Sequence, residues 1–320
     1  MPSVRPVALA YNTVYLVEDA GQAVLVDTGP DYRGARETIA EAIRPRRPTA
    51  VIATHGHLDH AGLGSWWQEA GVPVALGRAD LPQALGHADA DIDRMEDYIR
   101  QSGAPPLVQI EAIEGLEARR RWAHDMRTSR EWRPSTDGRW PTALRYPPFE
   151  PLQVIDGETG FPCGLRALPS PGHTPGNLVA VHKEEGWLFS GDQLLPEITP
   201  TPAIQVAGEQ RFHSLPEFLA SLEALRAMHL ARCFPGHGQP FDNVDEVIAA
   251  NLAQAESRTE RLDLALRQFG ESTLYSLAEH LYPRALARRF WQIISTIQGH
   301  LDVLERQGRA AFDGARWRPL

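Results

Sequence analysis

The sequence Thr-His-Gly-His-Leu-Asp-His at residues 54–60 places four potential metal-binding side chains within six residues. It directly follows Thr-Ala-Val-Ile-Ala at residues 49–53, an apolar run typical of a buried strand. Imidazole nitrogens and carboxylate oxygens are the ligands that zinc and similar divalent ions bind in proteins. Gly56 predicts a sharp turn that lets both flanking imidazoles face one point. A polar loop with neighbouring histidines is the alternative, but this density of ligands favours a metal site.

Strand-like and helix-like segments alternate around this stretch. The β-branched runs at 14–17 and 23–26, separated by Glu-Asp-Ala-Gly, predict a hairpin. Apolar residues at helical spacing predict a helix over 34–44, and a further helix over 62–70 precedes a strand at 71–75. Strands alternating with helices in this way indicate an α/β layered fold.

A second group of strands is predicted between residues 152 and 234. Asp156-Gly157 and the turn at 183–186 are typical of antiparallel hairpins. A helix is expected over 215–228. The predicted strands cover residues 152–155, 164–168, 177–181, 187–189 and 231–234.

Two regions differ in character from this α/β body. Residues 81–149 predict a helical insertion, with helices over 89–101 and 109–130, that ends in an irregular aromatic loop. After residue 242 the chain is almost wholly helical and ends in a potential hairpin around an Asp-Gly turn, which suggests a small winged-helix-like module. Its predicted helices cover residues 244–268, 273–282 and 284–307.

The composition of the 320 residues is that of a globular protein: 42% are hydrophobic and the net charge is −9. No apolar run approaches the roughly 18–20 residues of a membrane span, and the first residues do not resemble a signal peptide. We therefore expect a cytoplasmic protein without a membrane partner. Cys163 and Cys233 lie far apart in sequence, which predicts two reduced cysteines rather than a disulfide.

Three later segments carry a polar residue beside glycines, each after a predicted strand. They are Ser-Pro-Gly-His173, Ser-Gly-Asp192 and Pro-Gly-His237-Gly. Each motif alone is weak. Their shared position is a stronger signal, because the ends of neighbouring strands converge on one edge of a sheet.

In this order, the motifs resemble the five-motif pattern of the metallo-β-lactamase superfamily, and Asp27 in Val-Asp-Thr-Gly matches its first motif. The resemblance covers residues 11–240 apart from the insertion. Residues 240–320 are similar, more loosely, to the winged-helix-like domain of one branch of lactamase-like hydrolases. The resemblance implies an αββα sandwich in a catalytic domain over 1–241, with the insertion at about 81–149, followed by a winged-helix-like domain over 242–320.

The resemblance also implies a centre of two metal ions, expected to be zinc, with iron or manganese left open. Seven ligands are too many for one tetrahedral zinc but suit two ions about 3.5–4 Å apart. A shared hydroxide would be the nucleophile, Asp59 a proton shuttle, and Asp27 a hydrogen-bond partner of a ligand or its loop. By position, the first ion would be held by His55, His57 and His173, the second by Asp59, His60 and His237, and both by Asp192.

The substrate is less determined than the chemistry, because superfamily members cleave thioesters, lactones, lactams and phosphodiesters. We expect an ester or thioester substrate, with phosphodiester cleavage of RNA as the alternative. A mononuclear iron dioxygenase and a non-catalytic regulator are further alternatives. Arg119, Arg120 and Trp132 in the insertion are predicted to contact an acyl chain or an anionic carrier such as coenzyme A. Alternatively, they form a solvated charge run and a tryptophan that fixes the insertion.

The C-terminal module raises the question of RNA. Relatives with this architecture include an endoribonuclease, and residues 283–320 carry seven arginines against three acids. However, the body of the chain is acidic, and the helix over 284–307 has mainly an apolar packing face, with Arg284, Arg288 and Arg289 only at its start. A recognition helix needs a polar face. We therefore expect a structural role or a homodimer contact.

Overall fold

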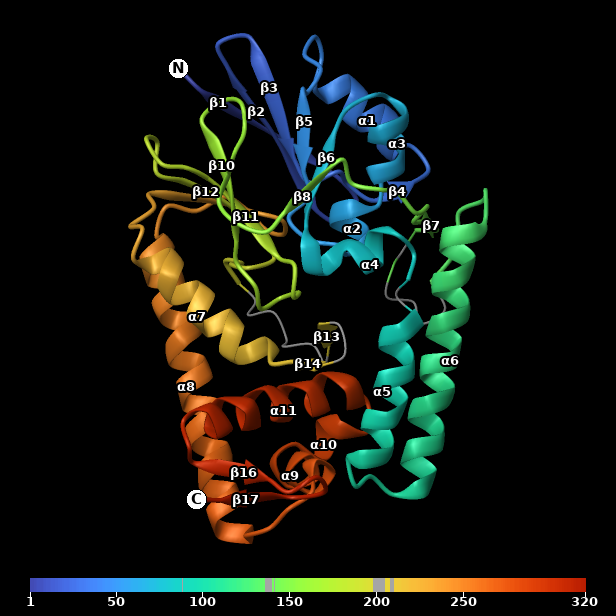
Figure 1. Ribbon diagram of the computed structural model, residues 1–320, viewed down its shortest axis with the longest axis vertical. Helices are drawn as coiled ribbons and strands as arrows, with labels where there is room; N and C mark the ends of the chain where they lie inside the picture. Colours follow the sequence, from blue (N-terminus) through green and yellow to red (C-terminus); the bar gives the residue numbers. More distant parts are fainter. Residues whose placement is uncertain (88, 136–139, 141, 198–204, 208–209) are drawn as a thin grey trace.

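The computed structural model describes residues 1–87, 89–135, 140, 142–197, 205–207 and 210–320. Two sheets form the upper part of the molecule in Figure 1, with helices below and beside them. The first sheet has the order β1 (Ser3–Ala8), β2 (Thr13–Asp19), β3 (Gln22–Val26), β5 (Ala50–Ile52), β6 (Val74–Gly77) and β8 (Gln153–Ile155). The second has the order β15 (Arg232–Pro235), β12 (Trp187–Gly191), β11 (Leu178–His182), β10 (Leu165–Pro169) and β9 (Thr159–Gly160).

The inner faces of the two sheets pack on each other. Successive residues of a strand point to opposite faces, so Tyr15 and Val17 of β2 contribute to the cluster between the sheets. Leu165 of β10 and Phe189 of β12 meet them from the second sheet. Both faces of β2 are buried, which explains why its sequence is a continuous apolar run rather than an alternating one.

Helices cover the outer faces of both sheets. On the first sheet, Leu16 and Leu25 pack with Ile39 of α1 (Ala35–Ala42) and Trp67 of α3 (Gly64–Glu69). On the second sheet, a separate cluster joins the strands to two helices. Its members include Val179, Leu188, Leu222 of α7 (Ser214–Arg226) and Ile248 of α8 (Val244–Phe269). The four layers confirm the predicted α/β sandwich.

The strand connections match the sequence prediction in part. The hairpin β2–β3 and the hairpin β11–β12 around residues 183–186 are confirmed. The predicted hairpin at Asp156-Gly157 is wrong, because β8 pairs in parallel with β6 and the chain then crosses to the second sheet. A turn signal shows where the chain reverses but not which strand it will pair with.

The insertion extends away from the sandwich (Figure 1). Ile99 and Leu116 of its two long helices form a small cluster with Phe290 and Trp291 of the C-terminal module. The insertion therefore packs on that module as well as on the sandwich. The segment η1 (Arg78–Asp80) directly precedes it, and its elements are α4 (Leu81–Ala84), α5 (Asp89–Gln101), α6 (Pro106–Thr128) and β7 (Leu144–Arg145), which pairs with β4 (Asp31–Tyr32).

The C-terminal module contains the predicted helices and terminal hairpin. The helix predicted over 284–307 is divided, because Arg289 has non-helical dihedral angles of φ −134° and ψ 43°. The winged-helix-like character of the module stays a prediction. The elements are α8, α9 (Leu274–Leu281), α10 (Pro283–Leu286), α11 (Phe290–Arg306), β16 (Ala310–Phe312) and β17 (Trp317–Pro319); a separate pair, β13 (Gln205–Ala207) and β14 (Gln210–Phe212), precedes α7.

Helix α8 contributes to two hydrophobic clusters. Near its start, Val244 and Ile248 pack under the second sheet. Near its end, Leu262 and Leu266 pack in the core of the C-terminal module. The division of the chain at 241/242 stays a prediction, and a single helix of 26 residues spans the two cores beyond it.

Two further expectations concern the environment of the chain. None of the helices in the described part of the chain combines the length and apolar character needed to cross a membrane. Cys163 and Cys233 are both buried and unpaired, as predicted.

Candidate metal centre

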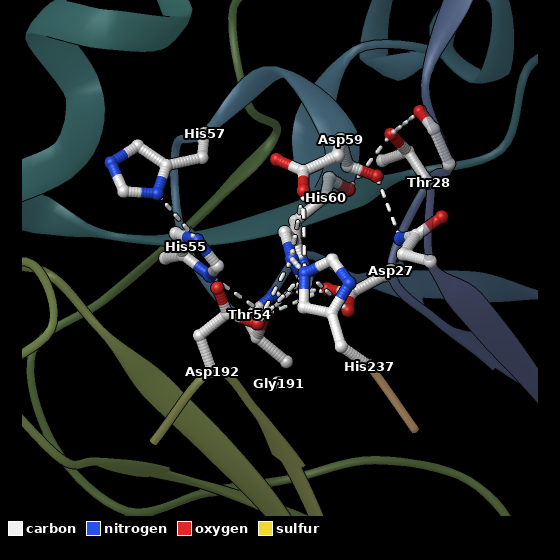
Figure 2. A network of polar contacts seen from close by, with 12 residues as sticks. Asp27, Thr28, Thr54, His55, His57, Asp59, His60, Gly191, Asp192 and His237 are labelled. Carbon is white, nitrogen blue, oxygen red and sulfur yellow. Dashed lines mark hydrogen bonds and ion pairs between the residues drawn. The ribbon is translucent and has the colours of Figure 1, made fainter. Parts of the chain in front are cut away.

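The candidate ligands lie at one edge of the sandwich because their strands run in the same direction. β3 and β5 are parallel, and so are β12 and β15. The segments that follow these strands therefore meet, although up to 182 positions separate them, from His55 to His237. Figure 2 shows His55 and His57 on one side of the site and Asp59, His60 and His237 on the other. The structure thus brings together all seven candidate ligands.

Three histidines form a first group, which we name the imidazole trio: His55, His57 and His173. His57 Nδ1 lies 2.9 Å from His55 Nε2 and 3.0 Å from His173 Nε2. His55 and His57 come from the loop after β5, and His173 comes from the loop between β10 and β11. The trio is therefore contributed by both sheets.

Asp59, His60 and His237 form a second group, the carboxylate trio. Asp59 and His60 lie in α2 (Leu58–Ala61), and His237 follows β15. Asp59 Oδ2 is 3.6 Å from His60 Nε2 and 3.4 Å from His237 Nε2, and the two Nε2 atoms are 3.4 Å apart. All three side chains point to a common space.

Asp192 lies between the trios. Its Oδ1 is 3.2 Å from both His60 Nε2 and His237 Nε2 in the carboxylate trio. Its Oδ2 is 3.4 Å from His173 Nε2 in the imidazole trio. One carboxylate thus faces each group with a different oxygen, which is the arrangement a bridging ligand requires.

The nitrogen and oxygen atoms of the site are arranged as metal ligands rather than as hydrogen-bond partners of one another. A neutral imidazole has one donor and one acceptor nitrogen, and in the imidazole trio two ring nitrogens face the single nitrogen His57 Nδ1. Nitrogen ligands of a tetrahedral zinc ion lie ~3.3 Å apart, given Zn–N bonds of about 2.0–2.1 Å. The observed separations of 2.9–3.4 Å are close to that value. Each trio, completed by an Asp192 oxygen, can therefore hold one ion.

The imidazole trio disfavours protons. Burial and the neighbouring His173 lower the pKa of His57 to about 3. Burial also lowers the pKa of His173, and it lowers that of His55 well below its ordinary value. Metal ions bind neutral imidazole, so these side chains are in the form a metal needs.

The carboxylate trio retains protons. Burial lowers the pKa of His60, but the carboxylates of Asp27 and Asp192 outweigh burial and raise it well above its ordinary value. Hydrogen bonds to Asp192 and Asp59 likewise outweigh burial and raise the pKa of His237 to about 10. A metal ion entering this trio has to replace those protons.

Asp27 supports the carboxylate trio from outside. Its Oδ2 is 2.7 Å from His60 Nδ1, and its Oδ1 accepts hydrogen bonds of 2.8 Å from the backbone N–H and hydroxyl of Thr54. These bonds reach both a candidate ligand and its loop. A proton held on Nδ1 leaves His60 Nε2 free to bind a metal. Asp27 also has a φ of 67°, a conformation that few non-glycine residues adopt.

Asp80 supports the imidazole trio, although no motif in the sequence indicates it. It is buried at the end of η1 and accepts hydrogen bonds from Gly56 N (2.9 Å), Thr174 Oγ1 (2.6 Å) and Gly176 N (2.7 Å). One carboxylate thus joins the loop of His55 and His57 to the loop of His173. Its only sequence signal is an acid shortly after a predicted strand.

Gly56 has a different role from the predicted one. Its φ is not in the left-handed region, so the turn does not require a glycine. A Cβ atom at this position would lie 2.5 Å from Gln83 Oε1 and 3.3 Å from the Cβ of Asp80. Glycine therefore favours the close approach of η1 and α4 at this position, rather than the turn.

Further contacts hold the ligand loops. Asn12 Nδ2 donates to the carbonyl of Asp59 (2.7 Å), and the Tyr146 hydroxyl donates to the carbonyl of Gly56 (2.7 Å). Gly191 has a φ of 52°, and a Cβ there would lie 2.4 Å from Thr54 Oγ1. This glycine lets β12 end against the first sheet, which places Asp192 between the trios.

The residues predicted to contact substrate lie in two places. Arg119 and Arg120 are in α6, where Arg119 is exposed and Arg120 forms an ion pair with Glu117. Trp132 lies near β4 and donates a 3.1 Å hydrogen bond to Asp31. The role of these three residues in substrate binding stays a prediction.

Comparison with known proteins gives consistent results. The family model described as metallo-beta-lactamase superfamily matches residues 9–237. The Bacillus subtilis (strain 168) protein named "Probable metallo-hydrolase YqjP" is 26% identical over 310 residues, which are 94% of this chain and 90% of that protein. An atrochrysone carboxyl ACP thioesterase from Paecilomyces divaricatus is 24% identical over 257 residues, covering 80% of this chain and 59% of that protein.

Solved structures show the same architecture. The crystal structure of a metallo-beta-lactamase family protein from Thermus thermophilus superposes with a TM-score of 0.66 and 25% identity. The superposition covers 100% of this chain and 98% of that chain. The similarity therefore extends through the insertion and the C-terminal module.

Proposed function

This chain belongs to the metallo-β-lactamase superfamily, and from that premise we propose that it is a hydrolase that uses two metal ions, zinc by preference, to cleave an ester or thioester. The observation that carries the proposal is the position of Asp192, whose two oxygens face the two trios. A single carboxylate placed in this way can hold a pair of ions at a fixed separation. The site would then act on a polarised carbonyl.

The chain's own residues have distinct parts in this reaction. Metal ions, when bound, lower the pKa of a coordinated water to about 7 and polarise the scissile carbonyl. The imidazole trio and the carboxylate trio orient the two ions. Asp59, whose side chain is 9% exposed, keeps a narrow contact with solvent beside His237. It is therefore positioned to pass a proton to the leaving group.

An ester or thioester is favoured over RNA by the C-terminal module. Helix α11, the candidate recognition helix, is buried along most of its length from Ile294 to Leu304. The basic excess of the final residues is also partly neutralised, because Arg306 pairs with Glu217, and Arg309 pairs with Glu260 and Asp263. The name of the fungal relative, a thioesterase, supports a thioester.

The test combines metal analysis with a substrate panel. We expect about two metal ions per chain, and hydrolysis of at least one thioester or ester that a chelator abolishes and zinc restores. The panel includes lactones, bis-p-nitrophenyl phosphate and RNA. Faster cleavage of RNA or of the phosphodiester would replace the proposal by the nuclease alternative. One iron per chain with consumption of dioxygen would indicate a dioxygenase, and no activity in any metal-loaded form would favour a regulator.

A further inference from the structure

A cavity of about 500 Å³ lies where the insertion meets β4 and the residue after it. It is lined by Tyr32 and Arg33 from the region of β4 and by Arg130, Trp132 and Thr142 from the insertion. Two arginines and two aromatic rings therefore face the same space. Cations beside flat apolar surfaces are typical of sites for phosphate-bearing ligands.

Trp132, which lines this cavity, is held in place by Asp31. Asp31 is fully buried and accepts hydrogen bonds from Arg36 Nη2 (3.1 Å), Arg145 Nη2 (2.9 Å) and Trp132 Nε1 (3.1 Å). The guanidinium of Arg145 also lies 4.6 Å from the centre of the Trp132 ring. Asp31 thus neutralises charge from these two arginines and fixes the plane of the tryptophan.

Unlike Arg36 and Arg145, the two arginines that line the cavity do not pair with Asp31. Arg33 and Arg130 are exposed, and neither forms an ion pair with a carboxylate in the described part of the chain. The lining includes one acid, Glu131, whose side chain is 82% exposed and lies 3.8 Å from Arg133. In a chain with a net charge of −9, two guanidinium groups without an acidic partner form a local site for an anion.

Tyr11 links the lining of the cavity to the metal centre. The ring of Tyr11 makes an edge contact with that of Tyr32, with ring centres 6.0 Å apart, and its hydroxyl accepts a 2.7 Å hydrogen bond from the backbone N–H of Thr142. The carbonyl of Tyr11 lies 2.7 Å from Nδ1 of His237. Tyr11 therefore contacts two lining residues of the cavity as well as one residue of the carboxylate trio.

We propose that this cavity binds the phosphate-bearing arm of a thiol carrier, as found in coenzyme A and in protein-bound phosphopantetheine, and so presents its thioester to the metal centre. The inference rests on the proposed thioester hydrolysis and names the class of leaving group. Arg33 and Arg130 bind the phosphate, and the rings of Trp132 and Tyr32 pack against the apolar parts of the arm. The cations assigned to the carrier are thus these two arginines rather than Arg119 and Arg120.

The test measures binding separately from hydrolysis. Calorimetry on the full-length, metal-loaded protein compares coenzyme A and 4′-phosphopantetheine with pantetheine, which lacks phosphate. We expect pantetheine to bind about 10–100-fold more weakly, as expected for hydrogen bonds between charged groups. Arg33→Ala and Arg130→Ala weaken coenzyme A binding by about the same factor and leave pantetheine binding unchanged. Arg318→Ala removes the same charge from the exposed C-terminal strand and serves as the matched control.

Each outcome bears on one proposal. Equal binding of pantetheine and coenzyme A, or an equal effect of Arg33→Ala and Arg318→Ala, would overturn the carrier site. Binding of a phosphopantetheinylated carrier protein but not of coenzyme A would support the site and identify its source as protein-borne. If thioesters are hydrolysed without phosphate-dependent binding, only the carrier site fails. If coenzyme A binds as expected and no thioester is hydrolysed, the proposed reaction fails and the site remains.

Discussion

The imidazole trio and the carboxylate trio lie within a few ångströms of each other and yet differ in affinity for protons. The first holds three buried histidines whose pKa values are lowered. In the second, Asp59, Asp192 and Asp27 surround His60 and His237 and raise their pKa values. The difference shows that the carboxylates beside each imidazole, two of them candidate ligands and one outside the ligand set, set the charge state of each half of the centre.

The largest effect is expected where the two trios meet. Asp192→Ala removes the oxygens facing both groups, so we expect loss of metal from both and a decrease in activity of more than about 100-fold, beyond the 10–100-fold typical of outer partners. Elemental analysis and hydrolysis rates measure this. Asp156→Ala, which removes an exposed acid paired with Arg78, is the control. Full metal content in the Asp192 variant would show that the trios are independent.

A smaller effect, confined to the carboxylate trio, is expected from Asp27→Asn. The amide has a single acceptor oxygen, so it cannot accept both from Thr54 and from His60 Nδ1; with the oxygen kept by Thr54, its NH2 group faces His60 and the ring loses its fixed orientation. We expect the affinity for one of the two ions to fall about 10–100-fold, measured by titration against a competing chelator. An equal loss at both ions would mean that Asp27 supports the whole centre.

Asp80→Asn is the counterpart for the imidazole trio. The amide replaces one acceptor oxygen where Gly56, Thr174 and Gly176 all donate. Asp80 contacts the ligand loops and not an imidazole ring. We therefore expect the affinity for a metal ion to fall by about 10-fold, the lower end of the range for outer partners. The ion affected should be the one held by the imidazole trio. A variant that loses the same ion as Asp27→Asn would refute the assignment of one carboxylate to each trio.

The smallest effect concerns the stability of the metal-free protein against pH. The pKa of His57 in the folded protein is about 3, below its ordinary value of about 6.5. Below pH 6.5 the unfolded chain therefore binds a proton that the folded protein does not. The contribution of His57 to the free energy of unfolding is present above pH 6.5 and is lost as the pH falls toward 3. The pKa of His237 rises to about 10, so its contribution is present below pH 6.5 and is lost as the pH rises toward 10.

Melting temperatures of chelator-treated protein between pH 4 and 10 test this opposition. His57→Gln should reduce the loss of stability on the acid side, and His237→Gln should reduce it on the alkaline side. If both variants changed the melting temperature on the same side of the pH profile, the two trios would not differ in their affinity for protons.

Much of the fold was predictable because its signals are local. The runs at 23–26 and 49–53 are each an apolar strand followed by a turn, and parallel strands then bring their ends together. Pairing partners are not local, so Asp156-Gly157 indicated a hairpin where the chain changes sheet. The same limit applies to the insertion, whose contact with Phe290 and Trp291 has no sequence signal.

The candidate site shows the same division. Its seven candidate ligands occur in dense or glycine-flanked motifs, whereas Asp80 stands alone in Gly-Arg-Ala-Asp and acts only through three donors from distant loops. The cavity beside Trp132 could not be predicted, because Arg33 and Arg130 are 97 positions apart. Charge patterns along a chain do not show which cations already have acidic partners in the fold.

The helix α8 has a mechanical consequence. A helix of 26 residues is about 39 Å long, and its two ends are anchored in different cores. Melting either core would expose apolar side chains of the same continuous rod, so the sandwich and the helical module should lose their structure together, in one cooperative transition. Cutting the chain just before this rod would strip the second sheet of part of its cover, so the catalytic body is not expected to remain folded without it.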